Sequence, residues 1–128
     1  MKKYFASISL LFFCLAGHSQ YKLKLTSNGY YTFGSVNSAN PGSITLTTSS
    51  DFTGTTTSDT LQATNDPLGT TGWINLKKGD DVTSMTHILN TASKTYSFEL
   101  VSFRYKFYRI KYTTNGSGYV TAVLNINP

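Results

Sequence analysis

The sequence contains 128 residues, with a formal net charge of +5 and one cysteine, Cys14. This length predicts a single domain. The basic residues are scattered, and Lys77-Lys78 is closely followed by Asp80-Asp81, whereas a nucleic-acid-binding protein usually gathers its cations on one face. We therefore expect no nucleic acid among the partners.

Residues 1–20 have the order of a secretory signal peptide. A short positive start precedes the apolar run Ile8–Ala16, and small residues follow that run. The run is too short to cross a bilayer, which takes about 20 residues. We expect cleavage near Ser19-Gln20, a mature domain over residues 21–128, an extracellular or periplasmic location, and no insertion into a membrane.

Cys14 lies within that signal. Two phenylalanines precede it where a lipoprotein signal has small residues, so we expect no lipid anchor. The mature chain then lacks cysteine, which excludes a disulfide, a zinc-thiolate site and a thiol nucleophile. It is rich in Thr, Ser, Asn, Gly and Tyr, and its one glutamate is Glu99. Because helices favour other residues, this composition predicts an all-β domain.

Short runs of alternating apolar and polar residues follow one another through the mature chain. In Tyr21–Thr26 (YKLKLT) the lysines lie opposite the apolar residues, as in a half-buried edge strand. Seven to nine such strands, separated by turn residues, predict a single antiparallel β-sandwich, either a jelly roll or an Ig-like fold. Val82–Thr91 is expected to be strand or irregular structure. The other expected strands are Tyr30–Phe33, Ser43–Thr48, Thr55–Thr64, Trp73–Leu76, Thr95–Leu100, Phe103–Tyr112 and Tyr119–Ile126.

The segment Phe103–Ile126 is the densest apolar and aromatic stretch of the mature chain. The side that carries the aromatic residues changes near Phe107-Tyr108, which predicts either a β-bulge or a strand buried on both faces. Asn115–Gly118 (NGSG) supplies residues that accept a positive φ angle. We therefore expect this segment to form the central hairpin of the sandwich.

Two segments of the sequence, taken together, resemble a known type of domain. The first is Thr60–Asn65 (TLQATN) with Trp73–Leu76 (WINL) after it, and the second is Tyr105–Tyr112 (YKFYRIKY), a glycine-rich turn and Tyr119–Ile126. This order resembles small discoidin-like jelly-roll domains, which occur in secreted bacterial binding proteins and in phage virion or decoration proteins. The resemblance covers about half of the mature chain, and it implies binding to surfaces, glycans or other subunits. Where the family typically has Ser-Asn-Asp-Gly, this chain departs, because a proline follows its Asn-Asp.

Catalytic and metal-binding patterns are weak. His87 is the only histidine of the mature chain, and no Gly-x-Ser-x-Gly elbow accompanies it. We therefore expect no enzymatic activity and no cofactor. A structural calcium remains an alternative, although the chain lacks a calcium-loop motif and its oxygen donors are spread out. The candidate ligands are Asp51, Asp59, Asn65, Asp66, Asp80 and Asp81.

The aromatic residues are the most suggestive feature, because flat rings stack on the apolar faces of sugars. Tyr30, Tyr31 and Trp73 could form such a platform, and Asn65 and Asp66 lie in the loop before Trp73. Neighbours in a strand point to opposite faces, so we expect one tyrosine to be buried and the other exposed. For Trp73, burial in the core is the favoured alternative.

These observations predict a secreted, non-catalytic binding or adhesion module that recognises a surface glycan or a protein partner. The residues expected to contact the ligand or partner are Tyr30, Tyr31, Asn65, Asp66 and Trp73. The alternative is a structural subunit, such as a virion decoration protein or a component of an extracellular filament, and a homo-oligomer would fit that alternative.

Overall fold

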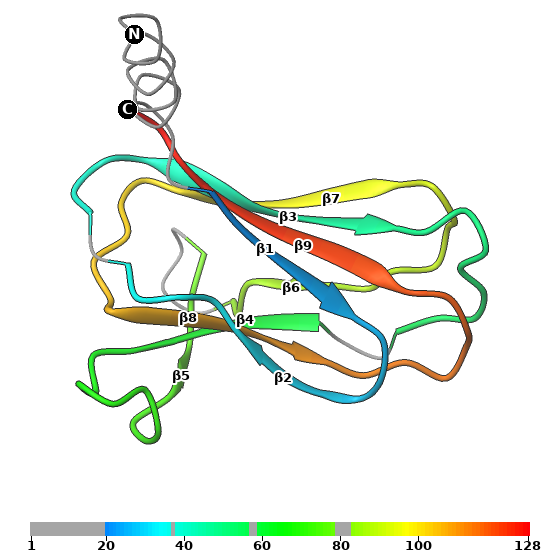
Figure 1. Ribbon diagram of the computed structural model, residues 1–128, viewed down its shortest axis with the longest axis horizontal. Helices are drawn as coiled ribbons and strands as arrows, with labels where there is room; N and C mark the ends of the chain where they lie inside the picture. The colour runs from blue at the N-terminus through cyan, green and yellow to red at the C-terminus, as the bar shows by residue number, and fades with distance from the viewer. Residues whose placement is uncertain (1–19, 37, 57–58, 79–82) are drawn as a thin grey trace, which may run out of the picture.

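The computed structural model describes residues 20–36, 38–56, 59–78 and 83–128 (Figure 1). The signal-peptide prediction concerns residues that, apart from Gln20, lie outside these ranges. All regular secondary structure in the described ranges is β-strand, so the all-β prediction is confirmed. The strands are β1 (Gln20–Leu25), β2 (Gly29–Thr32), β3 (Gly42–Thr48), β4 (Asp59–Thr64), β5 (Ile74–Asn75), β6 (Thr86–His87), β7 (Thr95–Leu100), β8 (Phe107–Tyr112) and β9 (Val120–Ile126).

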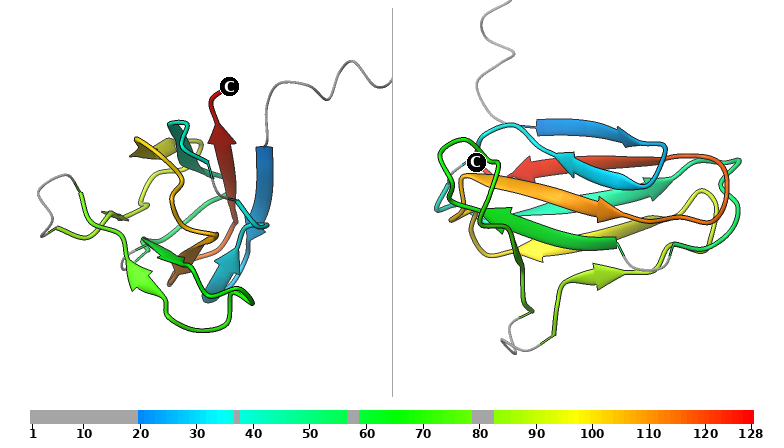
Figure 2. Two further views of the ribbon diagram at one scale, coloured as in Figure 1. Left: turned by 90° about the vertical axis from the view of Figure 1, so that its left-hand side faces the viewer. Right: turned by 90° about the horizontal axis from the view of Figure 1, so that it is seen from below.

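The strands form two antiparallel sheets that pack face to face (Figures 1 and 2). One sheet has the order β1-β9-β3-β7, and the other has the order β2-β8-β4-β5, with β6 also paired to β4. If β5 and β6 count as one position, the first strand pairs with the last, the second with the second to last, and so on inward to the middle of the chain. This wrapped order is that of a jelly roll. An Ig-like sandwich has strand orders ABED and CFG instead, so the topology decides between the two predicted alternatives.

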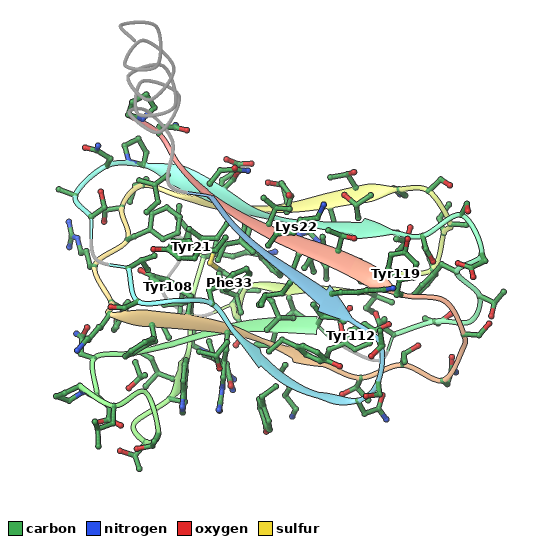
Figure 3. All side chains as sticks on the ribbon, in the orientation of Figure 1. Tyr21, Lys22, Phe33, Tyr108, Tyr112 and Tyr119 are labelled. Carbon is green, nitrogen blue, oxygen red and sulfur yellow. The ribbon has the colours of Figure 1, made fainter. Side chains whose placement is uncertain are left out.

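The core lies between the sheets. Inward-facing residues alternate along β3, where Ile44 and Leu46 are fully buried, and along β9, where Val120, Ala122 and Leu124 are. Figure 3 shows large aromatic side chains in the same space, and the three labelled there that are almost fully buried are Phe33, Tyr108 and Tyr112.

The expectation of a central hairpin over Phe103–Ile126 is wrong. β8 and β9 are not paired with each other, because β8 lies between β2 and β4 in one sheet and β9 lies between β1 and β3 in the other. The connection over residues 113–119 crosses from one sheet to the other. Both strands are nevertheless central in their own sheets, as their apolar content predicts.

The expected β-bulge near Phe107 is also absent from the structure. β8 begins at Phe107, and the preceding residues bend instead of continuing the strand. Phe103 forms an isolated bridge with Ser38, and the Tyr105 N–H donates to the Tyr108 hydroxyl at 3.2 Å. The side that carries the aromatic residues therefore changes where the strand starts, which removes the need for an inserted residue.

β5 and β6 both pair with the edge of β4, and the residues next to them meet at an isolated bridge between Lys77 and Ser84. The Leu76 N–H donates to the Leu61 carbonyl, the Leu61 N–H donates to the Met85 carbonyl, and the Met85 N–H donates to the Leu76 carbonyl, each at 2.8–3.0 Å. One half of β4 pairs with β5 and the other half with β6. In Figure 1 β5 runs away from the two layers. The segment that includes β5 carries Trp73 and its neighbours to the outer face of the five-stranded sheet.

Candidate binding site on the outer face of the five-stranded sheet

A cation lies against two aromatic rings on this outer face. The Cζ atom of Arg109 in β8 is 4.0 Å from the centroid of the Tyr30 ring and 4.1 Å from the centroid of the Trp73 ring. Each such cation–aromatic contact has an interaction free energy of about 0.5–2 kcal/mol, and the larger values apply where the contact is shielded from water. Tyr30 comes from β2 and Trp73 directly precedes β5, so the contact joins opposite sides of the sheet.

Two amide side chains fix the arginine from the side. The Arg109 Nε–H donates to Gln62 Oε1 at 2.7 Å, and the Gln62 Nε2–H donates to Asn75 Oδ1 at 2.8 Å. Partial burial lowers the pKa of Arg109 from its ordinary value, but an arginine remains protonated in proteins. We call the five residues Tyr30, Gln62, Trp73, Asn75 and Arg109 the arginine cluster.

Strand alternation and register together assemble the arginine cluster. In β8 the residues Tyr108, Ile110 and Tyr112 are buried, so Arg109 between them points outward. Antiparallel register places Gln62 directly opposite Arg109 on β4 and Asn75 directly opposite Gln62 on β5. Directly opposed residues have their side chains on one face, which explains the continuous row of polar contacts.

The loop that leads to Trp73 is organised by Asp66. Its Oδ2 accepts hydrogen bonds from the Thr70 N–H at 2.7 Å, the Thr71 N–H at 2.9 Å and the Thr70 hydroxyl at 2.9 Å. These bonds hold the pKa of Asp66 well below its ordinary value. Gly69 lies over the ring of Phe107 with a φ of +65°, and a Cβ there would come within 3.0 Å of the ring. The loop therefore packs closely on the end of β8.

The structure separates the five residues that the sequence selected. Tyr30 is 55% exposed, and the half-buried Trp73 meets it across Arg109. Tyr31 points the other way: its ring meets the buried Tyr112 edge-on, and its hydroxyl donates to the Ser27 carbonyl at 2.8 Å. One tyrosine of the pair is thus outward and the other inward.

Asn65 and Asp66 shape the loop instead of joining the arginine cluster. Asn65 Oδ1 accepts from the Lys106 N–H at 3.0 Å, and the carboxylate of Asp66 is occupied within its own loop. Sequence reasoning missed Arg109, Gln62 and Asn75. Their outward positions in alternating strands could have been read from the sequence, but the register that brings the three together could not.

Comparison of the chain with protein-family models, with curated proteins and with solved structures found no match in any of the three. The discoidin-like resemblance therefore stays a prediction. In the described ranges, no helix is long and apolar enough to cross a membrane.

His87 has a structural environment. One ring nitrogen, Nε2, lies 2.7 Å from the backbone carbonyl of Ser97 in β7, and the ring centroid is 4.6 Å from that of Phe98. These contacts connect β6 to the edge of the opposite sheet. Within the described part of the chain, no serine or carboxylate side chain is hydrogen-bonded to this ring.

The described oxygen donors of the suggested calcium site do not converge. No group of three or more His, Cys, Asp or Glu side chains is placed to hold a metal in the described ranges. Asp59 is fully buried between the sheets, and Asp66 lies in the loop before Trp73. Asp80 and Asp81 lie outside the described residues.

A cleft of about 420 Å³ lies where the two sheets are open to solvent, between β5 and the segment that links β7 to β8. Ile74 and Val101 line it, with 47% and 86% of their surfaces exposed. Lys77 and Arg104 add positive charge at its sides. This cleft is the second distinctive surface feature of the molecule.

Proposed function

We propose that this chain is a secreted, non-catalytic binding module that recognises a glycan or a protein partner at a surface. The arginine cluster is the single observation that carries the proposal. It presents an exposed tyrosine ring, a half-buried indole and a row of planar polar side chains on one face of a sheet.

This combination suits a sugar ring better than a catalytic reaction. An aromatic face stacks on sugar C–H groups, and planar amide and guanidinium groups exchange hydrogen bonds with hydroxyls. The arginine cluster contains no serine, cysteine, histidine or carboxylate, the side chains that most often act as nucleophile or general acid and base. Because Arg109, Gln62 and Asn75 come from adjacent strands and are hydrogen-bonded in a row, with the two rings packed against the guanidinium, the surface is preorganised, which lowers the entropic cost of binding.

The test is a glycan array probed with the mature chain, with and without calcium, followed by titration of each hit. Tyr30→Ala and Trp73→Ala should each weaken binding at least tenfold, which corresponds to about 1.4 kcal/mol. Tyr119→Ala is the matched control. Tyr119 is an exposed tyrosine at the four-stranded sheet, with the Lys24 ammonium 4.1 Å from its ring centroid, so it reproduces a cation–aromatic pair elsewhere.

A flat array together with no partner recovered from native culture medium would refute the binding module. Equal losses in the Tyr30 and Tyr119 variants would show that the arginine cluster is not the binding surface.

The cleft favours a second candidate, a structural subunit that assembles through exposed aliphatic side chains. Val101 is 86% exposed beside Ile74, and large exposed apolar residues next to each other often mark interfaces. A subunit of this kind should be oligomeric at micromolar concentration in light-scattering measurements after size exclusion. Val101→Asp should then shift it to the monomer, whereas a wild-type chain that stays monomeric would exclude assembly through this cleft.

A further inference from the structure

The guanidinium of Arg109 carries a full charge with few protein partners. Its Nε–H bonds to Gln62, and both neighbouring rings are neutral. In the described part of the chain no carboxylate forms an ion pair with it, and its terminal nitrogens have no protein acceptor. An arginine that is partly removed from water normally pairs with an anion. This one is held in place with its terminal donors unused.

Among the described residues, the charge around the arginine cluster is predominantly positive. Lys111 is exposed on the same face of β8, directly opposite Tyr30. The side-chain carboxylates that the structure describes are engaged elsewhere: Asp51 with Ser49, Asp59 in the core, Asp66 within its own loop, and Glu99 with Ser97 on the other sheet. The outer face is therefore complementary to a negative ligand.

We propose that the arginine cluster binds the carboxylate of an acidic sugar, with the terminal nitrogens of Arg109 as the anchor. This inference rests on the proposed function and narrows it to carboxylated glycans, such as those that contain uronic or sialic acids. The planar fork of a guanidinium matches a carboxylate through two parallel hydrogen bonds. The Tyr30 ring beside it supplies the apolar surface that a sugar ring needs, and the Asn75 side-chain amide stands within the same row for a hydroxyl.

Trp73 supplies the readout, because it is the only tryptophan of the chain and contacts Arg109 directly. Its fluorescence would be followed while the mature protein is titrated with two acidic probes, a galacturonic-acid oligosaccharide and sialyllactose. Each acid has a neutral counterpart of the same shape or core: the methyl-esterified oligosaccharide and lactose.

We expect at least one acidic probe to bind at least tenfold more tightly than its neutral counterpart. The pair that shows this preference identifies the ligand as a uronic-acid or a sialic-acid glycan. Raising the salt concentration should weaken this preference, because it rests on charge. Two observations would overturn the carboxylate inference while leaving a glycan-binding module intact. One is equal binding of an acid and its neutral form, and the other is binding of neutral array glycans alone. No binding of any glycan or partner would remove both proposals.

Substitutions locate the anchor. Arg109→Lys keeps the charge and loses the fork, so it should weaken acid binding about tenfold, and Arg109→Gln should abolish the preference for the acid. Lys111→Gln removes the neighbouring cation and should change affinity less than about threefold. A larger loss for Lys111→Gln than for Arg109→Gln would refute the assignment of the anchor. Comparison of the two probes on the wild-type protein does not depend on how well any variant folds.

Discussion

Asp59 offers the sharpest test of how this fold is stabilised. Its side chain is fully buried at the start of β4, and Oδ2 has no hydrogen-bond partner in the described structure. The Thr113 N–H lies 3.4 Å from Oδ1, and the Thr56 hydroxyl also bonds to the carboxylate. Burial outweighs these bonds and raises the pKa of Asp59 from 3.8 to about 6. The perturbation is Asp59→Asn, which removes the charge and keeps the shape.

The direction in which stability changes with pH follows from proton linkage. The folded state holds the Asp59 proton more tightly than the unfolded chain does, so its contribution to stability is fully present below about pH 4. That contribution is lost as the pH rises through about 6, where the folded carboxyl ionises without adequate partners. The difference between the two pKa values corresponds to about 3 kcal/mol, because each pKa unit is worth about 1.4 kcal/mol.

The amide of the variant adds a cost of its own. Its Nδ2 needs an acceptor, and an unsatisfied buried donor costs about 1–3 kcal/mol. The Tyr112 hydroxyl is also buried in this region, and its burial, followed by a smaller effect of the Asp59 charge, raises the pKa of that phenol. The amide cost does not change with pH. As the pH rises from 4 to 7.5, the free energy of unfolding of Asp59→Asn should therefore increase by about 2–3 kcal/mol relative to that of wild type. This change does not depend on the absolute stability of the variant.

The assay is urea unfolding of both proteins at several pH values across this range, followed by circular dichroism. Every other titratable group, His87 included, is present in both chains, so the difference isolates Asp59. Asp51→Asn is the control, because Asp51 is exposed in the loop after β3, and its difference from wild type should stay within about 0.5 kcal/mol at every pH. If the Asp59→Asn difference is equally flat, the buried-carboxylate reasoning is refuted.

Two further predictions concern loops. Asp66→Asn should speed amide exchange at Thr70 and Thr71, which donate to the carboxylate at 2.7 and 2.9 Å, while global stability changes little; unchanged exchange would show that the loop is held by other contacts. Because those bonds keep the folded pKa of Asp66 low, wild-type protection should persist at pH 4 and fail only in stronger acid. Gly116→Ala should lower the free energy of unfolding by about 1–3 kcal/mol, because the new Cβ would lie 1.8 Å from the Thr53 carbonyl oxygen. Ser50→Ala, at an exposed position in the loop after β3, is its control, and a Gly116 variant as stable as that control would show that the backbone moves without cost.

The alternation of apolar and polar residues was sufficient to predict the fold class and several of the strands. Alternation correctly assigned β3, β7 and β9, because a sandwich strand has one buried face and the period of two follows directly from that. Ile110 and Leu124, which belong to the predicted strands Phe103–Tyr112 and Tyr119–Ile126, are both fully buried. The choice between a jelly roll and an Ig-like fold required the pairing of distant strands, which the alternation within each strand does not encode.

The connection after β8 shows why strand pairing could not be predicted from the sequence. A glycine-rich turn between two apolar strands is compatible with a hairpin and with a crossing between sheets. Here Gly118 has a φ of +86°, and Gly116 packs against Thr53, so these glycines serve the contact with the loop after β3. The arginine cluster could not be predicted from the sequence for the same reason, since its members come from separate segments and are brought together only by the register of the strands.

The two outer faces of the sandwich present different side chains, and this difference supports the proposed binding surface on the five-stranded sheet. The four-stranded sheet turns mainly small polar residues and lysines to solvent, and its exposed Tyr119 lies against the Lys24 ammonium. The five-stranded sheet instead exposes Tyr30 beside a charged Arg109 and a half-buried indole. Stability alone does not require a partly buried arginine that has no anion beside it among the described residues. This arrangement becomes favourable when a ligand covers the Tyr30 ring and supplies the carboxylate, which is why we place recognition on this face.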